Sequence, residues 1–119
     1  MTIAFECGLD AAFAVLGGKW KPHILYQLAQ GTRRYGDLKR AVGGGVSDKV
    51  LIQHLKELVE DGVIDRIDHR TVPPKVEYSL TEFGSSLASS LGPLCAWGSE
   101  HMSQIQKLVK NRERSIAAA

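Results

Sequence analysis

The segment between Ser47 and Gly62 constrains the fold of this chain more than any other. Its leucines recur at spacings of four and three residues, the period of an amphipathic helix. They are Leu51, Leu55 and Leu58. Ser47 is a favourable N-cap and Gly62 a natural helix stop. At about 100° per residue, the opposite side faces solvent and carries polar residues. These are Lys49, Gln53 and Lys56.

Shorter elements are predicted on both sides of this helix. Apolar periodicity and glycine stops indicate three short helices before it. They cover about residues 10–16, 22–31 and 35–42. After it, two segments alternate apolar and polar residues, and prolines place a loop between them. The two segments are 63–68 and 76–80. Thr81 is the expected N-cap of a last, long helix, and we expect Gly92 and Pro93 to bend or interrupt that helix.

This order of elements is that of a winged helix-turn-helix, a mainly α fold (α+β) with a small β-hairpin wing. We place the helix-turn-helix at about 35–61, the wing at about 63–80 and the last helix at about 81–111 of a single domain, 1–119. The apolar seam of the last helix exceeds what a small core covers. We therefore expect a homodimer through the N-terminal and C-terminal helices. The interface candidates are Leu87, Leu91, Leu94, Cys95, Trp97, Met102 and Ile105.

The charge of the chain is segregated, although its net value is only +2. Residues 33–56 contain six basic and two acidic residues, a net of +4, and residues 57–68 contain one basic and five acidic residues, a net of −4. The basic block is a candidate phosphate-binding face, because Lys and Arg placed on phosphates release counterions. A solvated surface of mixed charge is the alternative.

The polar face of the central helix has the side chains that read DNA in the major groove. Lysine can contact guanine, and glutamine can contact adenine. Flanking cations would hold the phosphate backbone. We expect base-facing roles for Ser47, Lys49, Gln53 and Lys56, and backbone contacts for Arg34, Lys39, Arg40, Arg70 and Lys75. No catalytic constellation or metal-ligand spacing is recognisable, so we expect a protein that is not an enzyme and has no cofactor or metal.

The sequence also resembles the HxlR-type bacterial transcriptional regulators, from Cys7 to about His101. The motifs are Cys7 itself, 17–20 (GGKW), 33–38 (RRYGDL), 47–51 (SDKVL), 55–58 (LKEL), 72–81 (VPPKVEYSLT) and 97–98 (WG). The resemblance implies a dimeric winged-helix DNA binder that controls transcription. Two features depart from the family pattern: the Gly43–Gly45 turn is one residue longer, and Ile52 replaces a small polar residue. We expect Ile52 to pack rather than contact a thymine methyl.

The two cysteines have different expected roles. Some members of the resembled family sense quinones, aldehydes or oxidants through a cysteine at the position of Cys7. A thiol before a helix N-terminus, with Lys19 and Lys21 near it, would be suited to react as a thiolate. The alternative is a half-buried small hydrophobe at a dimer interface. Cys95 lies on the apolar seam and is expected to be core or interface.

The resulting hypothesis is a cytoplasmic homodimeric repressor that binds a pseudo-palindromic operator and responds to a small electrophile or oxidant through Cys7. The longest apolar stretch, 11–18, is too short to span a bilayer, and no basic segment of a secretory signal precedes it. Two alternatives remain: a winged-helix module that docks a protein partner, and a DNA-binding regulator with a non-covalent effector and no redox role for Cys7.

Overall fold

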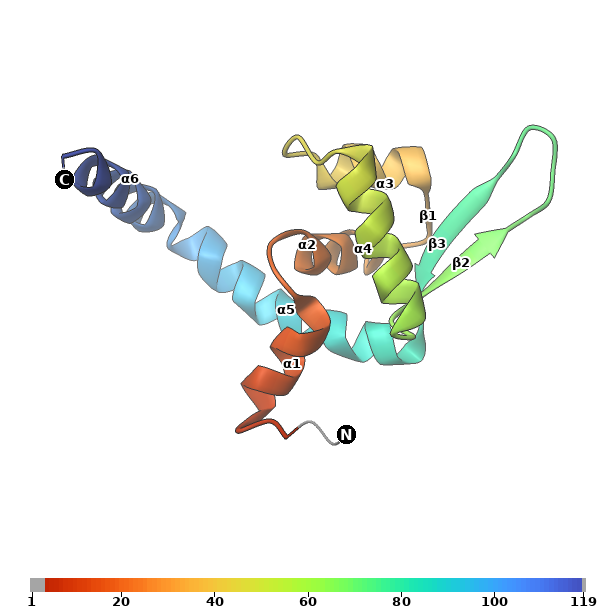
Figure 1. Cartoon of the computed structure of the whole chain (residues 1–119), viewed down its shortest axis with the longest axis horizontal. Coiled ribbons are helices and arrows are strands. Elements are labelled where there is room, and N and C mark those ends of the chain that lie inside the picture. The colour runs from red at the N-terminus through yellow and green to blue at the C-terminus, as the bar shows by residue number, and fades with distance from the viewer. Residues whose placement is uncertain (1–3, 119) are drawn as a thin grey trace. The chain divides into compact units, whose positions relative to one another are not determined.

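The structure, a computed structural model, describes residues 4–118, so residues 1–3 and 119 of the predicted domain lie outside the described residues. The described chain forms six helices and three short strands (Figure 1). Their bounds are α1 Gly8–Leu16, α2 Trp20–Leu28, β1 Arg33–Arg34, α3 Tyr35–Val42, α4 Asp48–Glu60, β2 Ile64–Asp68, β3 Val76–Leu80, α5 Glu82–Glu100 and α6 Met102–Ala118. The chain divides into two compact units, one up to Ser89 and one from Ser90.

The core of the first unit lies where α2 meets α3 and α4. The leucine stripe of α4 is buried, with 0 to 1% of each side chain exposed, as the periodicity predicts. Ile24 and Leu25 of α2 and Leu38 of α3 are fully buried with it. Ser47 caps α4 as predicted, because its Oγ accepts the N–H of Val50 at 3.2 Å. The helix-turn-helix thus consists of α3, the glycine turn and α4.

The wing is an antiparallel hairpin, β2 and β3, which lies against α4 (Figure 1). The strand order is β1-β3-β2, so β3 is the central strand, and Tyr78 pairs with both Arg33 and Arg66. The predicted winged helix-turn-helix, mainly helical with a small sheet, is confirmed. Strand β1 was not predicted, because two residues are too few to show an alternating pattern.

Close contacts join the start of the wing to the first turn of α5 within the first unit. The Thr81 hydroxyl donates to the carbonyl of Gly62 at 2.6 Å and accepts the N–H of Gly84 at 3.0 Å, which confirms the predicted N-cap. A Cβ built on Gly84 would lie 1.9 Å from the carbonyl oxygen of Val63. Only glycine therefore fits where the first turn of α5 crosses the start of the wing.

The last helical region is longer than predicted, and the break in it lies at a different residue. Of the two expected effects of Gly92 and Pro93, a bend or an interruption, the interruption is wrong: α5 continues through Pro93 to Glu100, and the break falls at His101. The bend stays a prediction. Proline removes the N–H that would pair with the carbonyl of Ser89, and both residues are exposed, so water can replace that bond. The second helix, α6, extends past the predicted end near residue 111.

Replacement of Gly84 by alanine should destabilise the fold. We expect the free energy of unfolding to fall by about 1–3 kcal/mol or more, because the new methyl group meets backbone that cannot move freely. Urea denaturation measures this change. The matched control is Gly36→Ala in α3, where the added Cβ makes ordinary contact at 3.6 Å and alanine favours the helix by up to ~1 kcal/mol. Equal stabilities of the two variants would contradict the expectation.

Candidate nucleic-acid interface

The outer face of α4 presents the predicted base-reading residues to solvent. Lys49, Gln53 and Lys56 are all exposed, on the side opposite the buried leucines. Ser47 is also exposed at the start of the helix, although its Oγ already serves as the cap. Ile52 was expected to pack, and this is wrong: 54% of it is exposed, because it lies outside the leucine stripe. The structure therefore brings these five side chains to the surface of one helix.

A chain of polar contacts runs from this face to α2. The Gln53 amide donates from Nε2 to Oε1 of Glu57 at 2.9 Å, and Nζ of Lys21 lies 2.6 Å from the other carboxylate oxygen, Oε2. Lys21 is only 8% exposed, and the Glu57 carboxylate, at the protein surface, balances its charge. The hydrogen bond from Gln53 and then that from Lys21 lower the pKa of Glu57 to about 2.

A second polar cluster braces the turn of the helix-turn-helix. The Tyr35 hydroxyl, at the start of α3, donates to Asp48 at the start of α4, and Nζ of Lys39 lies 3.0 Å from the same carboxylate. Burial, followed by the bond to Asp48, raises the pKa of Tyr35 to about 12. The bonds from Tyr35 and Lys39 lower the pKa of Asp48. The predicted backbone contact Lys39 therefore also fixes α3 against α4.

Three of the predicted backbone cations line one shallow depression of about 690 Å³ between α3 and the sheet. They are Arg34, Arg40 and Lys75. Two carboxylates share the depression: Asp37 pairs with Arg40, and Oε1 of Glu77 lies 3.6 Å from Nζ of Lys75. The cations of this surface therefore have acidic partners, and its role as a phosphate-binding face stays a prediction.

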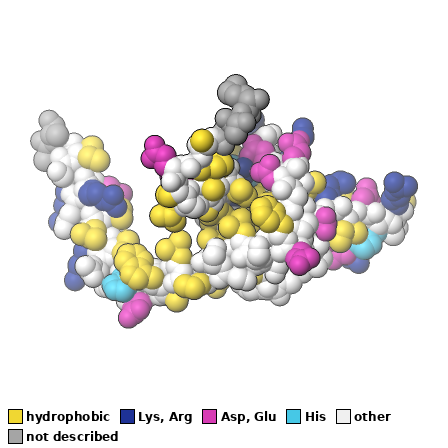
Figure 2. Space-filling view, turned by 90° about the horizontal axis from the view of Figure 1, so that it is seen from below, with side chains coloured by type: hydrophobic (Ala, Val, Ile, Leu, Met, Phe, Trp, Pro, Cys, Tyr) yellow, Lys and Arg dark blue, Asp and Glu magenta, His cyan; other side chains and the backbone are white. Residues whose placement is uncertain are grey.

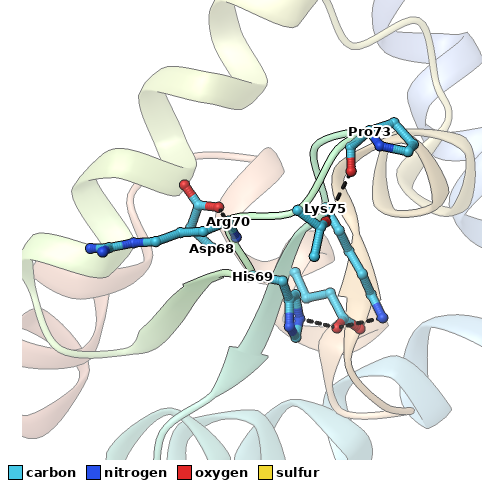
Figure 3. A network of polar contacts seen from close by, with 7 residues as sticks. Asp68, His69, Arg70, Pro73 and Lys75 are labelled. Atoms are coloured by element: carbon cyan, nitrogen blue, oxygen red, sulfur yellow. Dashed lines mark hydrogen bonds and ion pairs between the residues drawn. The ribbon is translucent and has the colours of Figure 1, made fainter.

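The wing carries its own network at the tip, shown in Figure 3. Nε2 of His69 lies 2.6 Å from Oε1 of Glu77, and the hydrogen bond from His69 lowers the pKa of Glu77, with Lys75 adding to the effect. Arg70 has a positive φ of 53°, and its N–H donates to Asp68 at 2.9 Å. Its side chain extends away from the cluster of His69 and Lys75. The structure thus leaves Arg70 extended and engages Lys75.

Both cysteines are exposed. Cys7 occupies the N-cap position of α1. The lysines expected near it have other partners: Nζ of Lys19 lies 4.6 Å from the centre of the Trp20 ring, and Lys21 pairs with Glu57. Cys95 is exposed on α5, so the core interpretation of that residue is wrong, and the interface interpretation remains a prediction.

The second unit exposes most of the predicted interface residues. Leu94 is 64% exposed, Trp97 55% and Met102 52%, while Ile105 is half-buried and Leu91 is buried. The remaining candidate, Leu87, lies in the first unit and is half-buried. Cys95, Met102 and Ile105 line a largely apolar groove of about 730 Å³ between α5 and α6. Hydrophobic side chains are visible at the surface of this unit on the left of Figure 2. Within residues 4–118, no helix combines the length and apolar character needed to cross a membrane.

These features define a winged helix-turn-helix protein with a polar recognition helix. Residues 15–106 match the HxlR-like helix-turn-helix family, and the chain belongs to this family. YtcD of Bacillus subtilis, described as an uncharacterized HTH-type transcriptional regulator, is 46% identical over 101 residues, which are 85% of this chain and 79% of YtcD. The protein is a transcriptional regulator, and its relatives are regulators rather than enzymes.

Two solved structures of similar proteins carry redox descriptions. The redox regulator HypR in its reduced form has a TM-score of 0.77 and 33% identity, covering 85% of this chain and 99% of HypR. Diamide-treated YodB from B. subtilis has a TM-score of 0.65 and 30% identity, covering 82% of this chain and 96% of YodB. The similarity to both proteins spans most of this chain.

Glu57 should make the stability of this fold depend on pH in the acid range. Its pKa is about 2 in the folded protein and 4.5 ordinarily, so its contribution is complete above pH 4.5 and is lost as the pH falls toward 2. The difference in unfolding free energy between wild type and Glu57→Gln, measured by urea denaturation, should therefore shrink from pH 7 to pH 3. Glu60→Gln, on the exposed side of the same helix, is the matched control, because it removes one carboxylate from α4 and leaves the pair of Lys21 and Glu57 intact. A constant difference for Glu57→Gln would contradict the assignment.

Proposed function

We propose that this protein is a sequence-specific DNA-binding repressor that acts as a homodimer on a pseudo-palindromic operator. The observation that carries the proposal is the exposed set of Lys49, Gln53 and Lys56 on α4. A helix of this kind fits the major groove, where lysine can contact guanine and glutamine can contact adenine. A dimer that occupies a promoter blocks transcription by its presence, so repression needs no further surface.

The phosphate backbone would be held by Arg34, Lys39, Arg40, Arg70 and Lys75, on α3, its flanking strand and the wing. Arg40 among these cations already contacts a carboxylate, that of Asp37, in an exposed pair. Exposed ion pairs contribute little to stability, about 0–1 kcal/mol, so exchanging a carboxylate for a phosphate costs little. The proposed phosphate contact of Arg70 is supported by its side chain, which is extended at the wing tip (Figure 3).

Dimerisation is supported by the exposed apolar side chains at both ends of the chain. On α1 these include Leu9, 67% exposed, and Phe13, 62% exposed. In the second unit, Leu94 and Trp97 are exposed beside an apolar groove. Apolar surface of this kind is typical of protein interfaces. A two-fold dimer would place two copies of α4 on half-sites about 34–36 Å apart.

Base-reading and backbone-holding residues should respond differently to mutation. Gln53→Ala and Lys49→Ala should each reduce discrimination against single-base changes in the operator by about 1–3 kcal/mol. Arg34→Ala should instead weaken binding to operator and scrambled duplexes alike and reduce the slope of log affinity against log salt by about 1. Titrations of both duplexes at several salt concentrations measure these effects. Equal weakening of both duplexes by Gln53→Ala would refute its role, and binding without salt dependence would favour the protein-docking module.

We further propose that a thiol-reactive effector acts through Cys7. The proposal is supported by the exposed position of Cys7 at the start of α1, and by the similarity to HypR and YodB, whose structures are described by redox state or oxidant treatment. Modification of Cys7 would shift the dimer between arrangements that bind DNA and arrangements that do not.

Treatment with diamide or a quinone should change operator affinity of the wild type and leave Cys7→Ser unchanged. Cys95→Ser is the matched control, because Cys95 is also exposed, and it should respond like the wild type. The measurement is a binding titration before and after treatment. An equal response of wild type and Cys7→Ser would refute the proposal and leave the non-covalent effector as the better explanation.

A further inference from the structure

The hydrogen bond between Gln53 and Glu57 fixes the orientation of the glutamine amide, with its NH₂ group toward Glu57. An ionised carboxylate can only accept hydrogen bonds, so the partner of Oε1 of Glu57 has to be the NH₂ group of Gln53, at 2.9 Å. The amide oxygen of Gln53 is then directed away from Glu57. One N–H remains for a further acceptor, because the NH₂ group has two protons and Glu57 uses one.

Glu57 is itself held in place by a lysine of α2. Its second oxygen, Oε2, lies 2.6 Å from Nζ of Lys21, which comes from α2 and is 8% exposed. Nδ1 of His54 lies 3.9 Å from the same oxygen. A buried ammonium left without its partner would be costly, so the carboxylate cannot swing toward solvent freely. The pKa of Glu57, about 2, keeps the carboxylate ionised at neutral pH.

We propose that Glu57 and Lys21 are positioning residues that set base specificity, by locking the Gln53 amide in one orientation toward the major groove. This inference rests on the proposed function, in which Gln53 faces a base. Adenine offers a donor, N6–H₂, beside an acceptor, N7, and a glutamine reads it with its oxygen and one N–H. An amide of fixed orientation presents that oxygen and N–H in one order along the groove. It therefore distinguishes an A·T pair from its reverse, which a freely rotating amide does less well.

The alternative role for the pair of Lys21 and Glu57 is purely structural, as a tie between α2 and α4. A structural tie affects stability and, through the pose of α4, all base contacts together. A lock on Gln53 affects one base-pair position in each half-site. The two roles are separated by measuring discrimination position by position.

The experiment begins with wild-type protein and a pool of duplexes with a randomised central region, from which a preferred site is selected. Gln53→Ala then identifies the position that Gln53 reads, by testing every single-base-pair change in the selected duplex. Glu57→Gln is tested on the same set, because a neutral amide can both donate and accept and so no longer fixes the Gln53 amide. Glu60→Gln, exposed on the same helix, reproduces the loss of one negative charge.

We expect Glu57→Gln to reduce discrimination at the Gln53 position by about tenfold and to leave the other positions within about twofold. Glu60→Gln should leave discrimination at every position unchanged. Full discrimination by Glu57→Gln at the Gln53 position, or an equal loss at every position, would overturn the inference while leaving the proposed function standing. If the wild type selects no preferred duplex, the proposed function fails and this inference fails with it. If Gln53→Ala alters no position, the base-reading role of Gln53 fails, and this inference fails with that role.

A second variant protects the test against a loss of folding, which thermal unfolding would reveal. Glu57→Asp keeps a negative charge for Lys21 but shortens the side chain, so the carboxylate withdraws from Gln53. The same loss of discrimination at the Gln53 position is expected, and its absence in a folded Glu57→Asp protein would equally overturn the inference.

Discussion

The burial of one leucine stripe orients everything else in the first unit. Leu51, Leu55 and Leu58 are 0 to 1% exposed, and burial of each contributes about 1.5–3 kcal/mol. Because the leucine stripe faces the core, the opposite face of the helix has to face solvent. Lys49 and Gln53 point outward because the leucines point inward, so the same sequence period that builds the core also presents the candidate DNA-reading surface.

Polar contacts then fix the position of α4 more closely than the apolar core does. Tyr35 and Lys39 of α3 hold Asp48 at the start of α4, across the turn formed by Gly43–Gly45. Lys21 and Glu57 do the same between α2 and the later turns of α4. These contacts are directional, so they hold the recognition helix in a defined rotation, which hydrophobic packing by itself specifies less sharply.

Local signals in the sequence predicted local structure well. The bounds of α3 and β3 agree with the prediction, because capping, glycine stops and alternation are written in neighbouring residues. Contacts between distant residues were beyond such signals: β1 exists only through its pairing with β3, and Lys21 meets Glu57 from another helix. The exposure of Lys49, Gln53 and Lys56 followed from periodicity, but the carboxylates that engage several candidate cations did not.

The junction at Gly84 ties the direction of α5 to the wing. Its backbone lies against the carbonyl of Val63, and Thr81 bonds to Gly62 in the same place. The first turn of α5 is therefore packed directly against the start of the hairpin. In the proposed dimer, the direction in which α5 leaves this junction would determine how far apart the two wings lie. The contact between Gly84 and the carbonyl of Val63 would then contribute to setting the length of DNA between the two half-sites.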